Sequence, residues 1–64
     1  EFVHFLFIAK GSAAEVETFL IIVNELGYIK ENDFVALKQQ ILEILKMLSS
    51  LIKSINPDSL KTKN

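Results

Sequence analysis

The sequence of 64 residues lacks cysteine and tryptophan, and it holds only one histidine, one proline and two glycines. The absence of cysteine excludes disulfide bridges and thiolate metal sites. Long apolar runs are absent too: the longest, residues 5–9 and 19–23, have five residues each, whereas a membrane-spanning helix needs about 20. The start also lacks the basic segment and long apolar stretch of a secretory signal. We therefore expect a cytoplasmic protein with no membrane partner.

What the sequence has in excess is apolar surface. Half of its residues are hydrophobic, and the mean hydropathy is +0.34. A chain this short buries too little surface to be comfortably stable alone. Small scaffolds usually need disulfides, a bound metal or a partner chain. Since the sequence begins at Glu1, without Met or a helix-capping residue, we expect it to be the later part of a longer protein.

The charges nearly balance, with a net charge of -1, which excludes a strong global attraction to nucleic acid. Their distribution is uneven. Residues 1–29 carry four glutamates and one lysine, a net charge of -3, whereas residues 30–64 carry six lysines and four acidic residues, a net charge of +2. The second half is therefore mildly basic.

The spacing of apolar residues predicts an all-α fold with two helices, over about residues 1–26 and 31–55. Gly27 suits the left-handed conformation that often ends a helix. Because the connection after it is short, the two helices should be antiparallel neighbours. No alternation of period two is sustained, so no strand is expected.

The boundaries of the second helix rest on residue types. Asn32 is the best N-cap by type, with Lys30 and Glu31 as alternatives. The helix should end near residue 55, because Pro57 disfavours helical backbone at the residue before it, Asn56. We expect residues 57–64 to form a flexible tail.

The second predicted helix has one apolar seam with a heptad repeat, widened by Leu45 and Ile52. Its members are Phe34, Leu37, Ile41, Ile44, Leu48, Leu51 and Ile55. Residues off this seam should face water, namely Lys38, Lys46, Ser49, Ser50 and Lys53.

The first predicted helix has two apolar faces, about 130° apart at 100° per residue. One is made by Phe2, Phe5, Ala9, Ala13, Val16, Leu20 and Val23, the other by Val3, Phe7, Ala14 and Ile21. Lys10, Glu17 and Asn24 separate the two on one side. A helix with two apolar faces contacts neighbours on both, and the second helix of a hairpin can cover only one. Further helices must cover the other.

The sequence contains no pattern of residues typical of a catalytic or metal site. His4 and Glu15 are eleven residues apart, about 16 Å along a helix, so they cannot share a metal. Glu15 and Glu17 point about 160° apart and cannot act as a carboxylate pair. Because phosphate-binding glycine loops, Ser–His–Asp sets and metal-spaced clusters are also missing, we expect no enzyme activity, no cofactor, no metal and no small-molecule substrate.

Two features allow both a structural and a functional interpretation. The small residues 11–14 (Gly-Ser-Ala-Ala) favour close approach of another helix, with a ligand-binding gap as the alternative, because glycine inside a helix costs about 1 kcal/mol. Lys38, Lys46 and Lys53 form either a solvated face or a strip that contacts nucleic-acid phosphates. No aromatic residues interleave with them for base stacking.

A longer pattern covers about residues 1–55. It comprises Glu1-Phe2, Phe5-Leu6, Ile8-Ala9, Gly11-Ser12, Glu15, Glu17-Thr18 and Glu25-Leu26-Gly27-Tyr28, then Lys46-Met47-Leu48 and Leu51-Ile52-Lys53-Ser54. This pattern resembles the later half of the bacterial four-helix-bundle proteins known as 23S rRNA-intervening sequence proteins. The chain departs from that family in having Lys30 where a serine helix cap is common.

The resemblance implies an up-down four-helix bundle whose first two helices are missing here, and a ring-like homo-oligomer such as a pentamer. The family's genes lie in sequences inserted into large-subunit rRNA genes, and a similar accessory protein of retroelements, which is more strongly basic, binds nucleic acid and a reverse transcriptase. We expect an oligomeric, non-catalytic bundle protein whose interface contains Val3, Phe7, Gly11, Ser12, Ala14 and Ile21. The alternative is an accessory factor that binds RNA or DNA through Lys38, Lys46 and Lys53.

Overall fold

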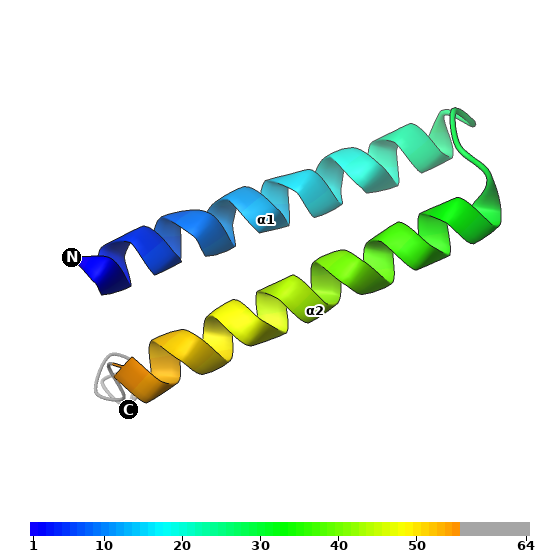
Figure 1. Ribbon diagram of the computed structural model, residues 1–64. Helices are drawn as coiled ribbons and strands as arrows, with labels where there is room; N and C mark the ends of the chain where they lie inside the picture. The colour runs from blue at the N-terminus through cyan, green and yellow to red at the C-terminus, as the bar shows by residue number, and fades with distance from the viewer. Residues whose placement is uncertain (56–64) are drawn as a thin grey trace, which may run out of the picture.

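The computed structural model describes residues 1–55, which form two α-helices and no strand. Helix α1 spans Phe2–Glu25 and helix α2 spans Glu31–Ile55. The two run antiparallel, side by side, with a short connection at one end (Figure 1). The all-α class predicted from the sequence is confirmed for the described residues, and the predicted tail, residues 57–64, lies outside them.

Helix α1 ends in a Schellman motif built on Gly27. The Gly27 N–H donates to the carbonyl oxygen of Asn24 at 3.0 Å, and the Tyr28 N–H donates to that of Val23 at 3.1 Å. Gly27 has φ 81°, a left-handed conformation that costs other residues about 1–2 kcal/mol. These two bonds satisfy carbonyls that the end of a helix leaves unpaired and turn the chain toward α2.

Helix α2 begins at Glu31, two residues earlier than a cap at Asn32 would place it. The carbonyl of Lys30 accepts the first intrahelical bond, from the N–H of Phe34 at 2.9 Å. Asn32 lies inside the first turn, where its side-chain oxygen accepts from the N–H of Asp33 at 3.1 Å. The prediction of Asn32 as the cap was therefore wrong, and Lys30, one of the alternatives, marks the boundary. The acidic side chains of Glu31 and Asp33 favour the positive end of the helix dipole there.

The contact with α2 lies between the two predicted apolar faces of α1. The least exposed residues of α1 recur every three or four positions, as the side facing a neighbouring helix must: Val3, Leu6, Lys10, Ala13, Glu17, Leu20, Val23 and Asn24. The expectation that Lys10, Glu17 and Asn24 only separate two faces was incomplete, because all three are partly covered. Helix α1 is apolar nearly all round, so its pattern alone selects no single side.

Helix α2 meets α1 along part of its predicted seam, through Phe34, Ile41, Leu45, Leu48 and Ile52. Lys38 and Ser49, which were expected to face water, are half-buried beside this contact. The Lys38 ammonium lies 5.7 Å from the centre of the Phe34 ring, within the range of a cation–π interaction.

The hairpin is one layer thick. Its extents are 42 × 23 × 15 Å, and the smallest is close to the roughly 10–12 Å diameter of a single helix. Among the described residues, only Leu6, Leu20 and Ile52 are buried hydrophobics. A single layer has two broad sides, and nothing within residues 1–55 covers either.

Candidate assembly surface

One broad side of the hairpin is apolar along its whole length. At 100° per residue, two right-handed antiparallel helices place Phe2 and Val16 of α1 on the same side as part of the α2 seam. The α2 members are Leu37, Ile44, Leu51 and Ile55, which are all exposed. We call this set the wide apolar side. The seam of α2 is therefore broader than its contact with α1, and half of it has no partner among the described residues.

The opposite broad side is mixed in character. Here α1 contributes Phe7, Ala14 and Ile21, one heptad apart, and α2 contributes Val35, Leu42, Lys46 and Lys53 by the same helical geometry. We call this set the lysine side. The side chains of Phe7 and Ile21 remain 43% and 37% exposed, so neither is fully covered within the described residues.

The structure separates the six residues predicted for the oligomer interface. Phe7, Ala14 and Ile21 lie together on the lysine side, with Gly11 at its edge. Val3 is half-buried toward α2, so much of its surface is already used within the hairpin. Ser12 points about 160° away from Ala14 on the helix and cannot join the same surface.

Gly11 is open on all sides within the chain. A Cβ added there would meet nothing within 4 Å, although glycine inside a helix costs about 1 kcal/mol relative to alanine. Close packing against α2 therefore does not explain this glycine. Two helical turns further along the same side of α1, the Thr18 hydroxyl donates to the carbonyl of Ala14 at 3.2 Å.

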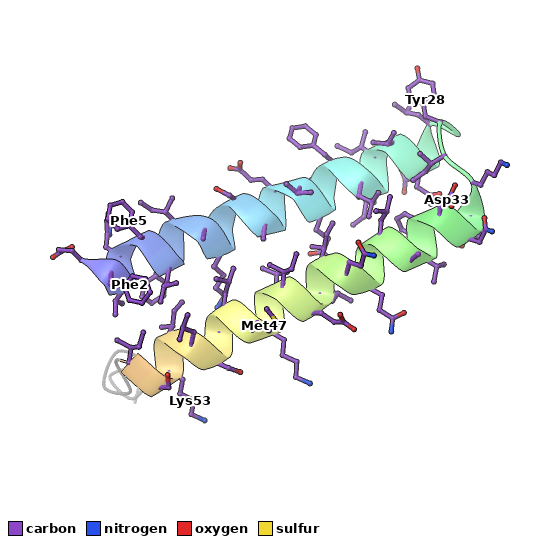
Figure 2. All side chains as sticks on the ribbon, viewed as in Figure 1. Phe2, Phe5, Tyr28, Asp33, Met47 and Lys53 are labelled. Carbon is purple, nitrogen blue, oxygen red and sulfur yellow. The ribbon has the colours of Figure 1, made fainter. Side chains whose placement is uncertain are left out.

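The three lysines predicted to contact phosphates differ in their surroundings. Lys46 and Lys53 are exposed, one heptad apart on the lysine side. Lys38 is half-buried against Phe34. Figure 2 shows Lys53 near the end of α2, on the edge that faces away from α1. Of the three lysines, Lys46 and Lys53 are therefore free to contact a ligand, whereas Lys38 already lies against the Phe34 ring.

A shallow groove on the flank of α2 was not foreseen from the sequence. It is lined only by side chains of α2, namely Phe34, Val35, Lys38, Gln39, Leu42, Glu43 and Lys46. The available signal was that Val35 and Leu42 stand one heptad apart outside the main seam. The groove carries two positive charges and one negative charge.

Two negative findings complete the description of residues 1–55. No group of three or more histidine, aspartate or glutamate side chains in this range is arranged to hold a metal ion. Neither of the two described helices is long and apolar enough to cross a membrane.

Comparison with protein families gives one match, which covers most of the hairpin. The family model described as 23S rRNA-intervening sequence protein matches residues 1–50. Comparisons with curated proteins and with solved structures gave no significant match. The family match includes all of α1, the Gly27 turn and most of α2, and it agrees with the resemblance seen in the sequence. The chain belongs to the family of 23S rRNA-intervening sequence proteins.

Proposed function

We propose that this hairpin is half of an up-down four-helix bundle, and that the protein works without catalysis by assembling into a homo-oligomer through helix–helix contacts. One observation carries the proposal: the hairpin is a single layer, and both of its broad sides expose large apolar side chains. Stable domains bury such surfaces between at least two layers. The missing layer must come from other helices.

The two broad sides suit different partners. The wide apolar side is broad and uncharged, as the interior of a bundle requires, and it would receive two further helices of the same protein. The lysine side carries both apolar and charged residues, as contacts between separately folded copies often do, and Gly11 lies at its edge. At about 1.5–3 kcal/mol for a fully exposed large side chain, covering the remaining surface of Phe7 and Ile21 would contribute about 1–2.5 kcal/mol per copy.

The test compares three substitutions of an exposed apolar residue by aspartate in the full-length protein, followed by light scattering and circular dichroism. Ile21→Asp, on the lysine side, should dissociate the oligomer into folded subunits. Ile44→Asp, on the wide apolar side, should unfold the subunit. Met47→Asp, on the outer edge of α2, is the matched control and should change neither property. A wild-type protein that stays a well-folded monomer at high concentration would refute the proposal.

A second candidate is an accessory factor that binds RNA or DNA. The observation favouring it is the exposure of Lys46 and Lys53 one heptad apart on α2. If these two and Lys38 each contacted a phosphate, affinity should fall by about 40-fold between 50 and 200 mM salt, from a slope of about -0.9 per contact. Changing all three to glutamine should remove most of this dependence, whereas Lys30→Gln, at the start of α2, should not. Undetectable binding at low salt would rule out this function.

A further inference from the structure

The side of α1 that faces directly away from α2 carries a third apolar pattern. Its positions repeat at three- and four-residue intervals, as in a helix that packs along a seam. They are Phe5, Ile8, Ser12, Glu15, Phe19, Ile22 and Leu26. We call this set the outer stripe. Phe5 and Phe19 are 65% and 66% exposed, and Figure 2 shows Phe5 on the edge of α1 opposite α2.

Charge interrupts this stripe at one place. Glu15 is exposed and stands near the middle of α1, with apolar residues on the stripe in both directions. A helix that packs along such a stripe brings this carboxylate toward its neighbour. The neighbour must then supply a positive charge near its own midpoint, because a carboxylate covered without a partner is costly.

The groove on α2 meets both requirements. Its lining includes the apolar side chains of Val35 and Leu42, and Lys46 stands at its C-terminal end, three residues beyond the midpoint of α2. Lys38 lies against Phe34, so Lys46 is the better-placed cation. Glu43 also lines the groove, which keeps a net positive charge. Because both helices have nearly equal length, aligning their midpoints in parallel brings Glu15 within one helical turn of Lys46.

We propose that the outer stripe of α1 docks into the α2 groove of a second copy of this chain, with Glu15 paired to Lys46 of that copy. This deepens the proposed homo-oligomer and rests on it. The stripe and the groove are different surfaces of one chain, so the contact is heterologous and continues from copy to copy. The groove is part of the lysine side, because Val35, Leu42 and Lys46 belong to both, and this brings Phe7, Ala14 and Ile21 next to the incoming helix.

The test is a charge swap in the full-length protein, read by sedimentation. Glu15→Lys and Lys46→Glu should each weaken assembly by at least about tenfold, because like charges then face each other. The two variants mixed in equal amounts should recover much of the lost assembly, since each contact between unlike variants joins opposite charges. The double variant should assemble as well. Lys53→Glu, the same charge change outside the groove, is the control and should leave assembly intact.

Three results would overturn the inference. If Glu15→Lys and Lys46→Glu leave the oligomer intact while Ile21→Asp dissociates it, the homo-oligomer stands but this contact is wrong. If Glu15→Lys lowers helix content instead of dissociating folded subunits, the outer stripe is covered by helices of its own chain. If neither charge variant is rescued on mixing although both fold, Glu15 and Lys46 do not meet.

Discussion

Replacing Gly27 by alanine tests the turn on which the hairpin depends. Gly27 has φ 81°, and its N–H and that of Tyr28 close the end of α1. A Cβ at this position would meet nothing within 4 Å, so crowding by neighbours would not contribute to the effect. The only expected cost is the backbone conformation itself.

The magnitude follows from two opposing terms. Left-handed backbone costs a residue with a Cβ about 1–2 kcal/mol. Against this, alanine restricts the unfolded chain more than glycine does, which favours folding by about 0.4–1 kcal/mol. The net loss of stability should be about 1 kcal/mol, which lowers the melting temperature of a domain of about 60–100 residues by about 4–8 °C.

The assay is thermal unfolding followed by far-ultraviolet circular dichroism at one fixed protein concentration, since assembly makes the melting temperature concentration-dependent. Gly27→Asn is the matched control, because asparagine tolerates left-handed backbone better than alanine does. Asparagine should recover part of the loss. An alanine variant as stable as the original protein would refute the assignment of this turn.

Three further substitutions test the packing, the start of α2 and Gly11. Leu20→Ala removes one of the buried side chains and should cost about 2–3 kcal/mol in urea unfolding, near the low end for leucine, whereas Met47→Ala should change stability by less than about 0.5 kcal/mol. Asn32→Ala should cost less than about 0.5 kcal/mol, because Asn32 is not the N-cap, whereas replacing a true N-cap asparagine by alanine costs about 1 kcal/mol. A larger loss would show that Asn32 caps the helix. Gly11→Ala should raise the helix stability of dissociated subunits by about 1 kcal/mol and weaken their association about tenfold, since a methyl group inserted at a close contact costs about 1–3 kcal/mol. Stronger association would show that no helix approaches there.

The parts of the fold that local chemistry determines could be predicted from the sequence. Gly27 ends α1 because it alone adopts φ 81° without strain, and the few residues after it leave room only for an antiparallel return. The start of α2 was harder to place. Asparagine is a strong cap by type, but its side chain bonds to the adjacent Asp33 N–H, a local alternative that composition does not reveal.

The side of α1 that faces α2 could not be predicted, and neither could the full candidate surface. A helical pattern selects a side when apolar and polar residues separate cleanly, as they do on α2. On α1, apolar residues point in nearly every direction, and the choice depends on which partner is present. For this reason the predicted interface set combined Phe7 and Ile21 with Val3, which packs toward α2, and with Ser12, which points elsewhere.

The orientation of α1 bears on the proposal of assembly. A rotation of α1 by about a quarter of a turn would bring Phe2 and Val16 against α2 and release Lys10, Glu17 and Asn24 to solvent. An isolated hairpin would gain apolar contact from that rotation. The observed orientation instead places three polar residues at the helix pair and leaves apolar side chains on both broad sides and on the outer stripe. Polar residues in such a seam lower stability but fix register. This arrangement is favourable only where other helices cover the exposed sides, which is what a subunit of a larger bundle requires.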